Sequence, residues 1–132
     1  MPYTETVLKV RNAINDTFEE IYPWFSQKPE VLNYRPVDHG WTIAEVLEHI
    51  TLTSHFLLVV ASNGSEKARK RAQNQCIEGS ESDLTTLVII GERGTFPWLR
   101  PEHMEPKRKP LSDVLVTMKS QQEQLSRQAQ KW

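Results

Sequence analysis

The sequence predicts an all-α protein, because three stretches carry apolar residues at helical spacing. The first covers about residues 4–21, the second begins at residue 42, and the third runs from residue 111 to the end of the chain. The apolar positions are Val7, Val10, Ile14 and Phe18 in the first, Ile43, Leu47, Ile50 and Leu57 in the second, and Leu111, Leu115, Met118, Leu125, Ala129 and Trp132 in the third. These stripes are those of helices that bury one face against each other.

The length of 132 residues suits one domain, 1–132, with one core. A net charge of −1 gives no electrostatic case for nucleic-acid binding. No uninterrupted apolar run approaches the roughly 20 residues of a membrane span, and the N-terminal residues lack the basic and apolar regions of a signal peptide. The single cysteine, Cys76, rules out an internal disulfide. We therefore expect a cytoplasmic protein that binds neither membrane nor nucleic acid.

Pro23 predicts the end of the first helix near residues 21–22, because proline lacks the N–H that a helix interior requires. We expect mainly loop over residues 26–41. Pro29 and Pro36 bracket a stretch in which a short helical turn can form, since proline is well tolerated at the first position of a helix.

The second helix has the most specific start signal in the chain. Thr42 is a suitable N-cap, and Glu45 stands three residues later, which together form the sequence pattern of a capping box. Asn63 and Gly64 predict that this helix stops near Ser62. The next residues favour a restart, so we expect helix to continue, after a kink, to about Gln75.

Residues 84–90 are ambiguous. Their β-branched side chains favour a strand, but the stretch is short and has no obvious partner strand, so we expect a short helix. Residues 91–110 contain four prolines and predict a long loop of the kind that often covers an opening. The last helix has one polar interruption in its packing seam, at Gln122.

His49 is a titratable side chain among aliphatic ones in the second helix. Glu45 precedes it by four residues and therefore lies on the same side. One interpretation is a structural histidine hydrogen-bonded near Glu45. The others are a metal ligand and a metal-free pocket residue.

Two segments, Trp41–Ile50 and Gly91–Pro106, resemble the DinB/YfiT-like superfamily. The resemblance covers about three-quarters of the chain and implies an up-down four-helix bundle that is commonly dimeric. In many members three histidines bind a divalent metal such as zinc or nickel, and characterised relatives include thiol-dependent transferases and isomerases. His49 matches the first of these histidines.

The sequence departs from the family pattern after that residue. The other two histidines normally form a His-x-x-x-His pair on a fourth helix, whereas this sequence contains no such pair and stops at Trp132. We therefore expect a DinB-like bundle that lacks the family's fourth helix. Such a bundle would expose an apolar groove, which favours a homodimer.

A catalytic zinc site usually needs three protein ligands. Besides His49, the sequence offers His103, His39, His55 and Glu45 as weak candidates, with Glu102 as a further oxygen donor. Motifs for a serine or cysteine nucleophile, a phosphate loop or a dinucleotide site are absent. We expect a metal-free or degenerate helical module that binds a small molecule or a partner. The alternative is a zinc- or nickel-dependent enzyme of the thiol-transferase or hydrolase type that uses His49.

Overall fold

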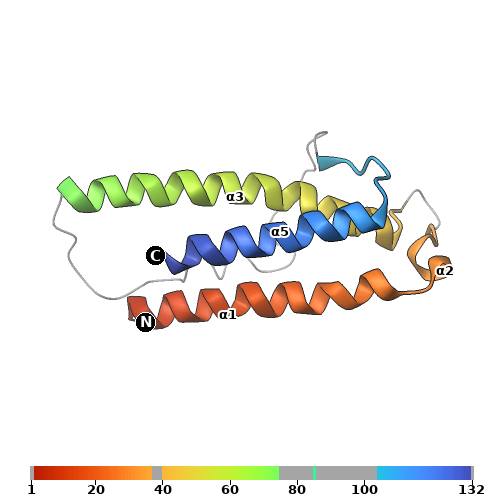
Figure 1. Ribbon diagram of the computed structural model, residues 1–132, viewed down its shortest axis with the longest axis horizontal. Helices are drawn as coiled ribbons and strands as arrows, with labels where there is room; N and C mark the ends of the chain where they lie inside the picture. The colour runs from red at the N-terminus through yellow and green to blue at the C-terminus, as the bar shows by residue number, and fades with distance from the viewer. Residues whose placement is uncertain (1, 37–39, 75–84, 86–103, 132) are drawn as a thin grey trace.

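Helices dominate the part of this protein that the structure describes. The computed structural model describes residues 2–36, 40–74, 85 and 104–131. These residues form α1 (Tyr3–Ile21), the 3-10 helix η1 (Tyr22–Ser26), α2 (Pro29–Leu32), α3 (Ile43–Asn74) and α5 (Leu111–Gln130) (Figure 1). No β-strand is found in these ranges. The prediction of an all-α bundle is therefore confirmed.

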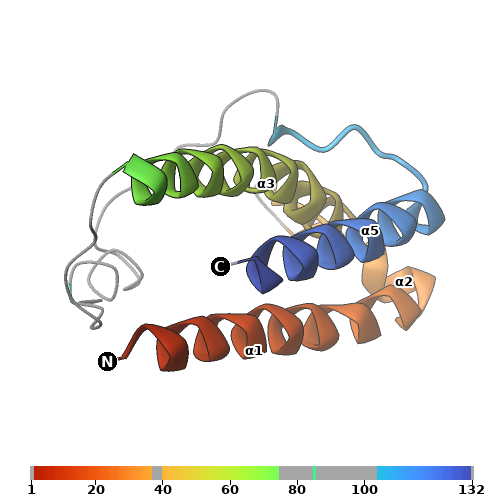
Figure 2. The ribbon, with the colours of Figure 1, turned by 60° about the vertical axis from the view of Figure 1, so that its left-hand side comes forward.

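The last long helix, α5, holds the other two long helices together. It packs against both α1 and α3, and it lies between them in the two views of the molecule (Figures 1 and 2). The direction of α1 is opposite to that of α3 and α5. Since α5 supplies most of the contact, α1 and α3 leave a groove between them on one side.

The hydrophobic core is concentrated at the end of the bundle where α2 lies. Leu32 of α2, Leu47 of α3 and Val114 of α5 are buried there in one cluster. Farther along α5, Met118 is completely buried. Apolar side chains from three helices thus meet around α5, as the packing of amphipathic stripes requires.

The helix α1 ends where the sequence predicts, because Pro23 follows Ile21 by two residues and the chain tightens there into η1. Several polar contacts join α1 and its extension to α5. The guanidinium of Arg11 donates two hydrogen bonds to the carbonyl of Ala129, at 3.1 and 2.8 Å. The Tyr22 hydroxyl donates to the side-chain oxygen of Gln122, the predicted polar interruption of the seam.

The start of α3 confirms the predicted capping box. The Glu45 amide donates to the Thr42 hydroxyl, and the Thr42 amide donates to the Glu45 carboxylate, both over 3.1 Å. The predicted stop at Asn63 and Gly64 is wrong, because α3 runs through both residues to Asn74, close to the predicted end.

The environment of Gly64 explains why the helix continues. Glycine in a helix costs about 1 kcal/mol relative to alanine. A Cβ added at Gly64 would meet nothing within 4 Å, so close packing does not require a glycine there. The segment that follows is rich in strong helix formers, including Glu66, Lys67 and Arg69, and these favour continuation.

The remaining predictions of secondary structure are confirmed where the structure describes them. The short turn after Pro29 is helical, as is the stretch from Leu111 to Gln130. Of the 84–90 stretch only Thr85 lies within the described residues, so the predicted short helix there stays a prediction.

By length and composition alone, α3 could cross a membrane. The core helix of a soluble protein passes the same test, so this property does not place the protein in a membrane or outside one. The expectations of a cytoplasmic location and of no membrane contact therefore stay predictions.

Candidate functional site

His49 is half-buried on α3, and both of its ring nitrogens have polar neighbours. Nδ1 lies 2.8 Å from the backbone carbonyl of Met104. A carbonyl oxygen only accepts, so Nδ1 carries the hydrogen, and in the neutral ring Nε2 then presents a lone pair. The Thr53 hydroxyl lies 3.3 Å from Nε2, and the Trp41 ring packs with its centroid 4.8 Å from that of the imidazole. The interpretation of a hydrogen-bonded structural histidine is compatible with these contacts, but the ring turns toward the segment before α5, so its partners are Met104 and Thr53 and not Glu45.

Glu48, the residue before His49, is a buried carboxylate that sequence reasoning missed. It is 2% exposed. Its Oε2 accepts a hydrogen bond from the Lys107 amide at 2.6 Å, and its Oε1 accepts from the Lys109 amide at 2.9 Å. Bonds of this kind stabilise an ionised acceptor more strongly than neutral hydrogen bonds do. The carboxylate therefore anchors residues 107–109 to α3.

Arg108 lies between the two anchored amides in an unusual backbone conformation. Its φ is 60°, in the left-handed region. This conformation costs a non-glycine residue roughly 1–2 kcal/mol. It turns the flanking N–H groups of Lys107 and Lys109 toward one point, as in other anion-binding turns of the main chain. The carboxylate of Glu48 lies at that point, so a side chain of the protein takes the place that a bound anion has in such turns.

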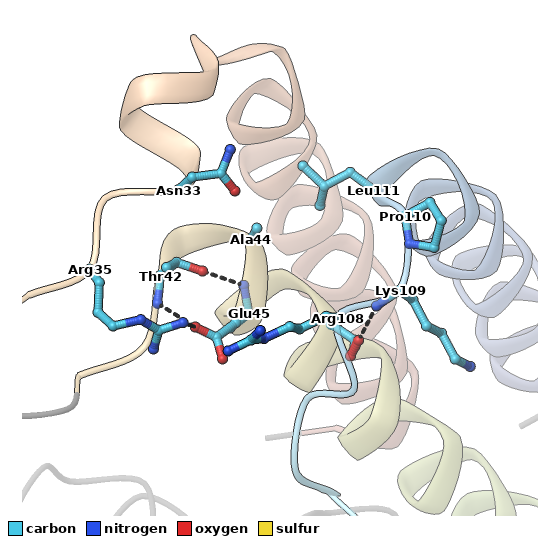
Figure 3. A pocket seen from close by; sticks show the side chains of 10 residues that line it. Asn33, Arg35, Thr42, Ala44, Glu45, Arg108, Lys109, Pro110 and Leu111 are labelled. Carbon is cyan, nitrogen blue, oxygen red and sulfur yellow. Dashed lines mark hydrogen bonds and ion pairs between the residues drawn. The ribbon is translucent and has the colours of Figure 1, made fainter.

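A cavity of about 560 Å³ lies beside this turn, between the segment after α2, the start of α3 and the start of α5 (Figure 3). Arg35 and Arg108 line it together with Thr42, Glu45 and Glu48. Arg35 donates to the Glu45 carboxylate at 2.6 Å and to the carbonyl of Gly40 at 3.1 Å. Both carboxylates of the cavity are therefore already engaged by groups of the protein.

The ionisation of Glu45 follows from these contacts. Desolvation by burial opposes the charge most strongly, but the hydrogen bond from the Thr42 amide and the contacts with Arg35 together outweigh it. The net effect lowers the pKa of Glu45 below its usual value. Its role in the capping box and ion pair makes Glu45 a poor candidate for a metal ligand.

An apolar groove of about 380 Å³ lies between α1, α3 and α5. Aliphatic side chains and Phe18 dominate its lining. The lining residues are Val10, Ala13, Ile14, Thr17, Phe18 and Ile21 of α1, Ile50, Ser54, Leu57 and Leu58 of α3, and Gln121 and Leu125 of α5. The groove therefore has the composition of a small-molecule site, with few polar groups in an apolar surround.

Gln121 is the buried polar residue of this groove, and the sequence pattern did not single it out. It is 6% exposed. Its Nε2 donates to the carbonyl of Thr51 at 2.7 Å. Its Oε1 is buried and has no donor in the part of the chain that the structure describes. An unsatisfied buried acceptor costs about 1–3 kcal/mol, so it calls for an explanation.

A sequence model described as the DinB superfamily matches residues 8–132. The chain belongs to the DinB superfamily. The resemblance read from the segments around Trp41–Ile50 and Gly91–Pro106 is thereby confirmed. No curated protein and no solved structure matches the chain significantly. Membership of the DinB superfamily accounts for the helical bundle and leaves the specific activity open.

The metal ligands found in many DinB proteins are not assembled within the described ranges. His49 has the orientation of a metal-binding histidine, because such residues usually donate their other ring N–H to a carbonyl or carboxylate. However, His55 is exposed and its ring lies edge-on to that of Phe56, with centroids 5.2 Å apart. His39 and His103 lie outside the described residues, as does Glu102. No group of three His, Cys, Asp or Glu side chains in the described segments could hold a metal. Among the described residues, His49 therefore lacks the two further ligands that a catalytic zinc site needs.

Proposed function

We propose that this DinB-superfamily protein binds a small, largely apolar molecule in the groove between α1, α3 and α5. The observation that carries the proposal is the groove itself, about 380 Å³ in volume and lined by all three long helices of the described chain. Small-molecule pockets typically have volumes of about 300–1,000 Å³ and mainly apolar walls. A binding module of this kind requires no metal, and His49 is not among the residues that line the groove.

A protein partner is the less suitable occupant of the groove. A standard protein interface covers roughly 800 Å² on each partner, a much larger surface than the mouth of such a groove. Exposed apolar side chains on α3 outside the groove lining, including Val59 at 46% and Val60 at 68% exposure, are compatible with the expected homodimer. That homodimer stays a prediction, and light scattering across a dilution series tests it.

The test of groove binding uses an apolar probe and a variant that fills the groove. We choose 2-methylnaphthalene as the probe, and Ser54→Phe as the variant because Ser54 lines the groove from α3. Ser112→Phe, at an exposed position near the start of α5, is the matched control. We expect saturable binding by the wild type and by the control Ser112→Phe. We expect this binding to be lost in Ser54→Phe. Equal binding by all three proteins, or no saturable binding, would overturn the proposal.

The second candidate function is a zinc- or nickel-dependent enzyme of the thiol-transferase or hydrolase type. It is favoured by the hydrogen bond from Nδ1 of His49 to Met104, which leaves Nε2 as a potential ligand. The test is the metal content per chain after stripping and reloading with zinc or nickel. Near-stoichiometric metal in the wild type and its loss in His49→Ala, but not in His55→Ala, would support this candidate. No specific metal in the wild type would exclude it.

A further inference from the structure

The orientation of the Gln121 amide is fixed by one contact. The Thr51 carbonyl can only accept a hydrogen bond, so the side-chain atom 2.7 Å from it is the nitrogen. Oε1 therefore occupies the other position of the amide. It is this oxygen that is buried without a donor in the described part of the chain.

The hydrogen bond to Thr51 does not explain why a glutamine is buried here. Thr51 lies within α3, where its carbonyl accepts the regular helical hydrogen bond from the amide four residues later. The backbone of α3 therefore has no need for the Gln121 donor. A methionine of similar shape could fill the same space without burying an amide, and buried polar groups are nearly always fully paired. The unused acceptor is thus the feature that distinguishes glutamine from an apolar residue at this position.

Gln121 contributes to the lining of the groove, next to apolar residues such as Leu125 and Leu58. We infer that the groove's ligand combines an apolar body with an uncharged hydrogen-bond donor, a hydroxyl or an N–H group, that bonds to Gln121 Oε1. This inference rests on the proposed function, since it specifies the ligand of the same groove. Oε1 is shielded from solvent in the unbound protein, so binding of the donor requires neighbouring side chains to move.

The probes for the test share one apolar body. 2-Naphthol carries a donor, 2-methylnaphthalene carries a methyl group of similar size, and 2-naphthoate at neutral pH carries only acceptors. Because the three differ in their affinity for water, we compare ratios of affinities between proteins. The protein variants are Gln121→Met, which removes the acceptor, and Gln124→Met, the matched control at an exposed position of α5. A ratio measured in this way isolates the pairwise contact, as in a double-mutant cycle.

We expect the affinity ratio of 2-naphthol to 2-methylnaphthalene to fall about three- to tenfold in Gln121→Met, which is the range for one neutral hydrogen bond. The ratio in Gln124→Met should equal that of the wild type, and 2-naphthoate should bind weakest. An unchanged ratio in Gln121→Met would overturn the inference while leaving groove binding intact. If neither neutral probe binds, the proposed function fails and the inference fails with it.

A second measurement covers the case in which Gln121→Met does not fold. A crystal structure of the wild-type protein with 2-naphthol should place the hydroxyl oxygen about 2.7–3.0 Å from Oε1 of Gln121. A naphthol bound in the groove with its hydroxyl turned to solvent would contradict the inference.

Discussion

The carboxylate of Glu48 and the backbone nitrogen of Lys107 lie 2.6 Å apart, although 59 positions separate them in the chain. The same carboxylate accepts a hydrogen bond from the Lys109 amide. One side chain of α3 thus fixes the approach to α5. Because α5 in turn packs against α1 and α3, this contact helps to set the position of the helix on which the groove depends.

Replacing Glu48 with leucine should destabilise the fold by about 2–4 kcal/mol, because two amides lose a charged acceptor at once. Urea unfolding measures the change. Glu66→Leu is the control on the same helix, since the Glu66 side chain is 57% exposed, and it should change stability by less than about 0.5 kcal/mol. Equal effects of the two substitutions would mean that Glu48 anchors nothing.

The capping box predicts a pH dependence centred on Glu45. Its pKa is lower in the folded chain than its usual value of 4.5, so the folded state favours the charged form. The resulting stabilisation is fully present above the unfolded-state pKa and is lost as the pH falls through the lower, folded-state pKa. The stability difference between wild type and Glu45→Gln should therefore be constant above about pH 6 and shrink below about pH 4.5. A difference that grows as the pH falls would contradict this assignment.

Position 108 should prefer glycine to any branched side chain. Arg108→Gly relieves the left-handed strain at φ 60° but raises the entropy of the unfolded chain, so we expect a change of between zero and about 1 kcal/mol in favour of the folded state. Arg108→Val should destabilise by about 1–2 kcal/mol, because β-branched residues tolerate this region worst. Thermal unfolding of the two variants gives the order of their stabilities. A valine variant as stable as the glycine variant would show that the backbone at position 108 is not strained.

Arg11 should contribute to stability through its two hydrogen bonds to the Ala129 carbonyl. Arg11→Met keeps much of the apolar stem and should cost about 1 kcal/mol, measured by urea unfolding. Arg69→Met removes a half-exposed arginine whose ion pair with Glu66 is 3.6 Å long, and it should be nearly neutral. If both substitutions are neutral, the two hydrogen bonds of Arg11 add nothing measurable to the packing of α1 against α5.

The helices could be predicted because their signals are local. Thr42 and Glu45 are three residues apart, and they form the capping box without help from the rest of the chain. Pro23 likewise ends α1 through its own missing N–H. The predicted helix stop at Gly64 was wrong, because a glycine is a weak stop signal when strong helix formers follow it.

The polar contacts of the candidate sites could not be predicted because their partners are distant in sequence. Gln121 reads as one of several polar residues of the last helix until α5 is placed against Thr51, 70 positions earlier. His49 forms its hydrogen bond with Met104 and not with Glu45. A spacing of four residues places His49 and Glu45 on the same face of the helix, but it does not determine the direction in which the imidazole ring points.

The contact of Glu48 with Lys107 and Lys109 is made to the main chain, so the identity of those two lysines does not matter to it. Nineteen of the twenty amino acids supply the amide that Glu48 requires, and only proline does not. Saturation mutagenesis at positions 107 and 109 should therefore tolerate nearly every substitution except proline, while position 48 tolerates few. The contact between Glu48 and the segment before α5 can therefore persist while the side chains at positions 107 and 109 change almost freely. A search for pairs of positions that vary together would not detect this contact.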